Sequence, residues 1–110
     1  MPASIRKQIF NGQTVANTTL NSEAIDITNY TGAGFQVDLT GAGIAGTVKV
    51  QTSNNGTNWV DVSGASQAIA GPNSYFFNVS LMFHALLRVQ VISTNANVAT
   101  CNGTAIGKAS

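Results

Sequence analysis

The sequence predicts an all-β protein: a single-domain antiparallel β-sandwich, jelly-roll-like or immunoglobulin-like, with about seven or eight short strands. Apolar and polar residues alternate with a period of two in several runs, and no helical period of useful length appears. Glycine-rich segments at 32–34, 41–46 and 71–72 separate these runs. A chain of 110 residues is long enough for one core. We expect a sandwich domain over 23–110, preceded over 1–22 by an N-terminal arm or edge strand.

The first part of the chain contains four expected extended segments. Residues 4–10 carry Ile5 and Ile9, and the weakly patterned residues 14–20 are expected to lie along an edge. The other two expected strands are 24–28, with Ile25 and Ile27 on one face, and 35–40, in which Phe35, Val37 and Leu39 alternate with Gln36, Asp38 and Thr40.

Residues 46–62 form a predicted hairpin, for which two turns are compared. A two-residue Asn55-Gly56 turn would mix buried and exposed residue types on each face. A three-residue loop, 54–56, sets Val50 opposite Val60 and Val48 opposite Val62 on the buried face, and Lys49 opposite Asp61 on the other. This alternation favours the three-residue loop, with Gly56 in a left-handed conformation.

The same register places Trp59 on the outer face, opposite Gln51 and beside the Lys49–Asp61 pair. An outward tryptophan is either covered by a neighbouring loop or terminus, or it contacts a partner. The covered arrangement is favoured because tryptophan is usually much buried.

Four further segments follow the hairpin. Residues 74–80 direct Tyr75, Phe77 and Val79 to one face and Phe76 to the other, and residues 86–93 direct Arg88 outward with Gln90. Residues 98–106 are expected to form the closing strand, with a bulge or bend at Asn102-Gly103. Residues 81–85 form an apolar connection between 74–80 and 86–93, and they contain Met82, Phe83 and His84. This connection either caps one end of the sandwich or forms an exposed contact patch.

Composition argues against several classes of function. Charged residues make up 8% of the chain and the net charge is +1, with scattered basic residues, so nucleic-acid binding is not expected. Cys101 is the one cysteine, which excludes an intrachain disulfide and a cysteine-based metal cluster and is expected to be buried. We expect neither a signal peptide nor a membrane span.

No catalytic constellation is apparent. His84 is the single histidine, and the four acidic residues alternate with apolar ones, which predicts solvated positions. Residues 41–46 match Gly-x-Gly-x-x-Gly, but they lie between expected strands with no helix to bind a phosphate. We therefore expect a protein that is not an enzyme and has no cofactor. The four acidic residues are Glu23, Asp26, Asp38 and Asp61.

Several segments together resemble the small β-sandwich virion structural proteins of bacteriophages and prophages. Their pattern is GTVxVQxS, a turn NDGTNW, then xxVSG, an aromatic strand, an RVxV strand and a closing strand of small residues. The resemblance covers about residues 23–107. The matching segments are 46–53, 55–59, 62–64, 75–79, 87–91 and 98–106, and residues 25–32 also resemble the strand and turn that open such domains.

The resemblance implies a non-enzymatic virion subunit: a capsid, vertex (penton), decoration or tail-associated protein. Such a subunit forms homo-oligomers and contacts other virion proteins, after synthesis in the cytoplasm of the bacterial host. Asn54 or Asn55 stands where the pattern has an aspartate, which removes a possible ion ligand, so no metal is expected. The unmatched N-terminus, with Arg6-Lys7, is a candidate arm ordered by contacts with other subunits.

The expected contact surface draws on both halves of the chain. The alternative function is a carbohydrate- or receptor-binding module of a spike, which binds a glycan or receptor of the host through Trp59 with Gln51, Asn58 and Tyr75 or Phe76. The candidate contact residues are Trp59, Lys49, Gln51, Asp61, Arg88, Phe76, Met82, Phe83 and His84.

Overall fold

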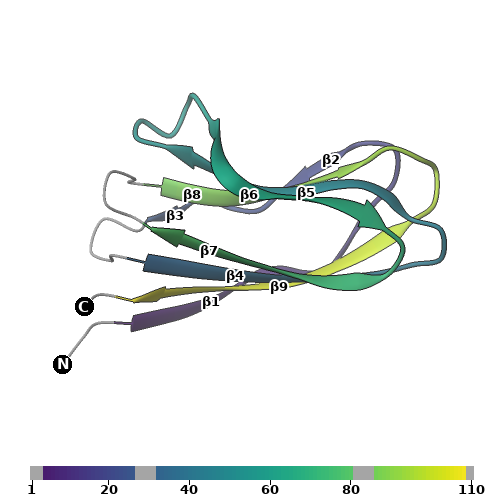
Figure 1. The fold of residues 1–110 in the computed structure, drawn as a ribbon, viewed down its shortest axis with the longest axis horizontal. Coiled ribbons are helices and arrows are strands. Elements are labelled where there is room, and N and C mark those ends of the chain that lie inside the picture. The colour runs from purple at the N-terminus through teal and green to yellow at the C-terminus, as the bar shows by residue number, and fades with distance from the viewer. Residues whose placement is uncertain (1–3, 27–31, 81–85, 109–110) are drawn as a thin grey trace.

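The computed structural model describes residues 4–26, 32–80 and 86–108, and within these ranges the chain forms nine strands and no helix. The strands form two layers, as the sequence predicts for a β-sandwich (Figure 1). The strands are β1 (Ser4–Val15), β2 (Thr19–Asn21), β3 (Ile25–Asp26), β4 (Gly32–Thr40), β5 (Ala45–Ser53), β6 (Val60–Ala70), β7 (Asn73–Ser80), β8 (Leu86–Ser93) and β9 (Ala99–Lys108).

The two layers are antiparallel sheets with different strand orders. The first sheet has the order β1-β9-β4-β7, and the second has the order β2-β8-β5-β6, with β3 also paired to β8. Neighbouring strands are therefore mostly distant in sequence: β1 pairs with β9 from Ser4↔Lys108 to Val15↔Ala99. The fold depends on pairings between opposite ends of the chain.

The core lies between the sheets and is built from the inward positions of alternating strands. The expected inward faces of β4, β7 and β8 are confirmed, since the apolar residues at every second position are buried. Burial of these apolar side chains away from water is the main stabilising contribution to the fold. The largest fully buried side chains are Phe10, Phe35, Leu39, Leu87, Val37, Val48, Val50, Val89, Val91 and Cys101.

The N-terminal segment lies in the sandwich as an edge strand over residues 4–15. Phe10 and Val15 of β1 are buried in the same core as the central strands. The β1–β9 ladder shifts between Gln8 and Phe10 and again between Asn11 and Gln13, so the extra residues are in β1. The prediction of a bulge at Asn102-Gly103 of β9 is therefore wrong. Each β9 residue has a partner in β1, and the bulges lie in β1.

Gly103 has a packing role instead. A Cβ at this position would lie 3.0 Å from Cγ1 of Ile9 and 3.1 Å from Cδ2 of Phe10. The absence of a side chain at Gly103 therefore lets β1 approach β9 closely, with the ring of Phe10 packed against the glycine.

The predicted register of the β5–β6 hairpin is wrong by two residues. The strands pair Thr52↔Val60 and Gln51↔Asp61, and the ladder then shifts so that Lys49 faces Ser66. Val60, expected to be buried, is 64% exposed. A slip of two residues keeps each side chain on its face, so Asp61 remains on the outer side.

Side-chain hydrogen bonds explain why the connection is longer than three residues. Oδ1 of Asn55 accepts the backbone N–H groups of Thr57 and Asn58 at 2.9 and 3.0 Å, and Oγ of Ser53 accepts the N–H of Gly56 at 2.9 Å. These local bonds replace ladder hydrogen bonds. Gly56 has φ +77°, so its expected left-handed conformation is confirmed.

Candidate functional site

A chain of polar contacts crosses the outer face of the second sheet from β8 to β6. Nε of Arg88 donates to Oε1 of Gln51 at 2.9 Å, and Nε2 of Gln51 donates to Oδ1 of Asp61 at 3.0 Å. Nζ of Lys49 donates to the other carboxylate oxygen of Asp61 at 3.1 Å. Gln51 thereby links the arginine to the carboxylate and is itself buried. We call these four residues, with Trp59, the polar ladder.

Trp59 completes the polar ladder by packing on the arginine. The guanidinium carbon of Arg88 lies 4.4 Å from the centroid of the Trp59 ring. One face of the indole is thus covered by a side chain of β8, and the residue as a whole is half-buried. The expected outward position is found, with an arginine rather than a loop or terminus as the cover.

Asp61 carries the negative charge of the polar ladder. Its pKa is lowered from the ordinary value of 3.8, first by the hydrogen bond from Gln51 and then by the hydrogen bond from Lys49. The carboxylate is consequently ionised at neutral pH and paired with two neighbours. Lys49 and Asp61 therefore neutralise each other within the polar ladder, while Arg88 keeps its charge and bonds to the neutral amide of Gln51.

The structure separates the remaining expected contact residues from the polar ladder. Phe76 is 55% exposed on the outer face of the first sheet, on the opposite side of the sandwich. Tyr75 is buried in the core. A single saccharide site that combines Trp59 with Tyr75 or Phe76 is therefore wrong. Met82, Phe83 and His84 lie outside the described residues.

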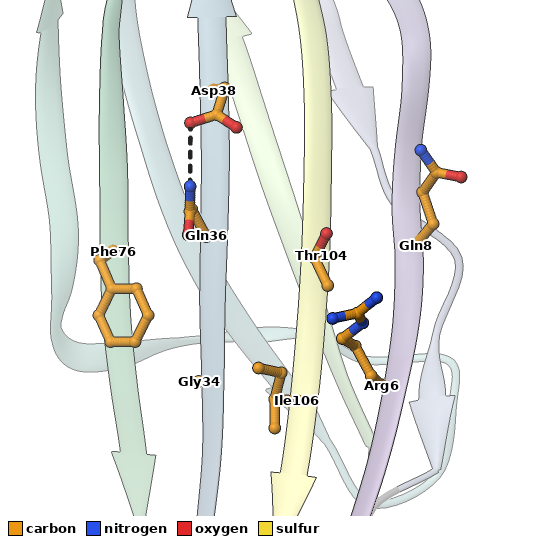
Figure 2. Close-up of a pocket in the computed structure, with 8 residues that line it drawn as sticks. All are labelled: Arg6, Gln8, Gly34, Gln36, Asp38, Phe76, Thr104 and Ile106. Atoms are coloured by element: carbon orange, nitrogen blue, oxygen red, sulfur yellow. Dashed lines mark hydrogen bonds between the residues drawn. The ribbon is translucent and has the colours of Figure 1, made fainter.

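Phe76 borders a groove of about 650 Å³ on the outer face of the first sheet. Figure 2 shows its side chains arranged across all four strands of that sheet, with Phe76 on one outer strand and Arg6 and Gln8 on the other. Gly34 forms the floor, since a Cβ there would lie 3.3 Å from the Phe76 ring. We call this feature the sheet-face groove; it is lined by Arg6, Gln8, Gly34, Gln36, Asp38, Phe76, Thr104 and Ile106.

The polar side chains of the sheet-face groove differ in whether they form hydrogen bonds within the protein. Asp38 accepts hydrogen bonds from Oγ of Ser74 at 2.6 Å and from Nε2 of Gln36 at 3.3 Å. Within the described part of the chain, Arg6, Gln8 and Thr104 form no side-chain hydrogen bond or ion pair. The groove thus offers a free guanidinium, amide and hydroxyl next to an exposed aromatic ring.

Sequence reasoning missed most of this groove. From the sequence, Arg6 is expected in a candidate arm, and no contact role is expected for Gln8, Thr104 or Ile106. Their alternation within each strand indicates a solvent face, but their proximity arises from pairings such as Arg6↔Ile106 and Gly34↔Ile106. Such contacts between distant parts of the chain leave no local pattern.

The acidic residues are distributed over separate surfaces. Glu23 pairs with Lys7 at 3.2 Å, and Asp38 and Asp61 lie on the outer faces of opposite sheets. Among the residues that the structure describes, no group of three or more His, Cys, Asp or Glu is placed to hold a metal ion. None of the described segments is a helix long and apolar enough to cross a membrane.

Cys101 is buried in the core, as expected for the single cysteine. Burial raises the pKa of its thiol from 9.0 to about 11. The side chain is therefore a neutral apolar group at physiological pH, unsuited to nucleophilic chemistry.

Three solved structures share this fold at low sequence identity. The SPBc2 prophage-derived protein YomS is 12% identical with a TM-score of 0.62, and the match covers 99% of this chain and 96% of that one. The PBSX exported protein XepA is 13% identical with a TM-score of 0.72, and the match covers 96% and 37% of the two chains. The infectious bursal disease virus VP2 subviral particle protein is 10% identical with a TM-score of 0.67, with 98% and 32% covered.

The chain spans nearly the full length of YomS but only about a third of XepA and VP2. No protein-family model matches the sequence, and no curated protein matches it significantly. At these identities the comparisons establish a common β-sandwich fold.

Proposed function

We propose that this protein is a non-enzymatic structural subunit of a bacteriophage virion that works through protein–protein contacts. The observation that carries the proposal is the end-to-end correspondence with a prophage-derived protein, in which nearly all of both chains is aligned. A viral particle protein contains the same fold as part of a longer chain. The phage pattern in the sequence, centred on 46–64, agrees with this assignment.

The chemistry of the surface supports a role in assembly. Charged residues make up 8% of the chain, and two of its lysines, Lys7 and Lys49, are paired with carboxylates of the same chain. Neutral polar and apolar side chains therefore dominate the exposed faces. Depletion of charge is a property of the buried parts of protein interfaces, where unpaired charges would lose their hydration.

The proposal places the protein in the virion as a capsid, vertex, decoration or tail-associated subunit, after synthesis in the host cytoplasm. Mass spectrometry of gradient-purified phage particles from the strain that carries the sequence tests it. We expect the chain at a stoichiometric copy number that is retained after a high-salt wash. Particles without the chain, with the protein found free in the lysate, would refute the proposal.

A second candidate function is recognition of a saccharide on the host surface, and the sheet-face groove favours it. Aromatic rings stack on the apolar faces of sugars, while amides, hydroxyls and arginines bond their polar groups. Phe76 and the free side chains of Arg6, Gln8 and Thr104 bring these groups together on one face. The polar ladder is less suited, since Asp61 is already paired with Lys49 and Gln51, and Arg88 is bonded to Gln51 and stacked on Trp59.

Binding to a glycan array and to whole host cells tests this second function. We expect Phe76→Ala to abolish binding and Trp59→Ala, on the opposite face, to leave it unchanged. Circular dichroism controls for folding of both variants. Equal binding by wild type and Phe76→Ala, or binding by neither, would eliminate the groove as a saccharide site.

A further inference from the structure

The two sheets end in edge strands, whose outward N–H and C=O groups are open to pairing with another chain. β1 and β7 border the first sheet, and β6 borders the second opposite the short strands β2 and β3. Natural proteins protect such edges with charged side chains, bulges, proline or very short strands. The four edges of this molecule can be compared by these criteria.

Three of the edges carry protective features. β1 contains Arg6 and Lys7 and two register shifts. β6 contains Asp61, leaves its ladder between Asp61 and Ser66, and has Gly64 at φ +79°. On the remaining edge, β2 and β3 have three and two residues. Each of these features interrupts or shortens a continuous row of free backbone groups.

β7 lacks all of these features. It is eight residues long, has no charged residue or proline, and pairs with β4 through eight consecutive partners without a register shift. Within the described part of the chain, β4 is its only paired strand. One edge N–H, that of Ser74, bonds to Oδ1 of Asn73, so the open stretch begins beyond Ser74.

The side chains beside this edge are also suited to a contact. Phe76 is 55% exposed, and a shallow, mainly apolar depression lies next to it, bounded by Ala33, Val79 and Ile106. Figure 2 shows Phe76 on the outer strand of the sheet, at the border of the groove. A regular, uncharged edge with an exposed aromatic side chain is a form that promotes strand-to-strand association.

We propose that β7 is a self-association edge, which pairs antiparallel with β7 of a second copy. The first sheet of each copy then becomes part of one continuous sheet. The inference deepens the structural role proposed above and rests on it for the biological setting of the contact. The neutrality of β7 argues for a second copy as the occupant, since two identical strands without charge meet without repulsion. Antiparallel pairing of identical strands is also self-complementary about a twofold axis.

A charge introduced on this edge tests the proposal. Light scattering at increasing protein concentration should show the wild type forming dimers, or larger assemblies that contain the dimer contact. We expect Asn78→Lys and Phe76→Lys to weaken this association at least tenfold, because lysines would meet across the axis. Gln8→Lys, on the same face but on β1, is the matched control and should associate as the wild type does. Circular dichroism verifies that every variant is folded.

Single-cysteine cross-linking supplies a readout of the register. Cysteine is introduced separately at 74, 76 and 78 and, as the control, at 8; the buried native Cys101 remains in place. A twofold strand pair places one β7 position opposite its own copy. If that position is 74, 76 or 78, its cysteine should form disulfide-linked dimers far faster than the others. If it is the buried position 75 or 77, mixed samples should cross-link 74 to 76 or 76 to 78 instead. Preferred cross-linking between cysteines at 8 and 76 in mixed samples would indicate β1–β7 pairing and overturn the proposal.

The outcomes separate this inference from the virion assignment. A protein that is present in particles but monomeric at millimolar concentration, or unaffected by lysines on β7, refutes the self-association edge alone. A protein that pairs through β7 in solution but is absent from particles refutes the virion role and upholds the edge.

Discussion

The guanidinium carbon of Arg88 lies 4.4 Å from the centre of the Trp59 ring, so the single tryptophan is held on the outer face by a cation from a neighbouring strand. Arg88 is in turn oriented by its 2.9 Å hydrogen bond to Gln51. A guanidinium fixed in this way holds the ring against the sheet.

A double-mutant cycle of Trp59→Leu and Arg88→Leu should give a coupling free energy of about 0.5–1 kcal/mol, as found for exposed cation–π pairs. Urea unfolding followed by circular dichroism measures it without relying on tryptophan fluorescence. A control cycle of Trp59→Leu with Lys7→Gln, which pairs with Glu23, should give none. Equal couplings in the two cycles would contradict a specific Arg88–Trp59 contact.

The lowered pKa of Asp61 predicts a defined dependence of stability on pH. A carboxyl group with a depressed pKa in the folded state stabilises the protein above its unfolded value of 3.8, and this contribution is lost as the pH falls through the lower folded pKa. Asp61→Asn should remove this part of the acid sensitivity. Thermal melting between pH 2 and pH 6 measures the difference.

Gln51 is the main cause of that depression, so Gln51→Met should raise the pKa of Asp61 toward 3.8. Lys49→Gln should also raise it, because Lys49 lowers the pKa both by its hydrogen bond and by its charge. Carbon-detected NMR titration of the Asp61 carboxyl group measures both changes. An unchanged pKa in Gln51→Met would contradict the contribution of the amide hydrogen bond.

Gly46 and Gly64 provide a matched pair for backbone strain. A Cβ at Gly46, at φ +147°, would collide with the carbonyl oxygen of Ile92, whereas one at Gly64, at φ +79°, would meet nothing within 4 Å. Gly64→Ala should cost about 1–2 kcal/mol from the conformation alone. Gly46→Ala should cost more than about 4 kcal/mol or prevent folding. Chemical denaturation compares them, and equal losses would contradict the clash.

Asn55 organises the hairpin loop through one side-chain oxygen. Asn55→Ala leaves two backbone N–H groups without their acceptor and should lower the free energy of unfolding by about 1–2 kcal/mol. Asn55→Asp keeps the acceptor and should retain most of the stability. If both variants lose the same amount in urea titrations, the hydrogen bonds to Asn55 do not determine the loop.

Cys101 should resist thiol reagents in the folded protein. Its pKa of about 11 and its burial keep the thiol neutral and inaccessible at pH 8, so labelling should occur only after denaturation. The raised pKa also predicts that stability falls as the pH rises from 9 to 11, since the unfolded thiol ionises first. Rapid labelling under native conditions would show that this part of the core opens.

Short-range patterns predicted which way side chains point, and the structure confirms this for Phe35, Phe77, Val89 and Arg88. The register of the hairpin was predicted wrongly because side-chain bonds of Ser53 and Asn55 extend the loop, and apolar periodicity carries no information about them. Two hairpin registers that differ by an even number of residues place the same side chains inward and outward, so the apolar pattern does not distinguish them.

The sheet-face groove was beyond sequence reasoning for a different reason. Arg6 and Ile106 are neighbours through the β1–β9 ladder although they are separated by nearly the whole chain. A period of two assigns each residue to a face of its own strand, but it does not say which strands lie side by side. The order β1-β9-β4-β7 is a property of the complete fold.

The pairing of Ser4 with Lys108 has a mechanical consequence. β1 and β9 are adjacent and antiparallel, with residues 4 and 108 at the same end of the sandwich (Figure 1). Tension applied between these two points would peel β1 from β9 one backbone pair at a time, a geometry that yields at low force. A load that enters through the faces or edges of the sandwich would instead be shared by many hydrogen bonds at once.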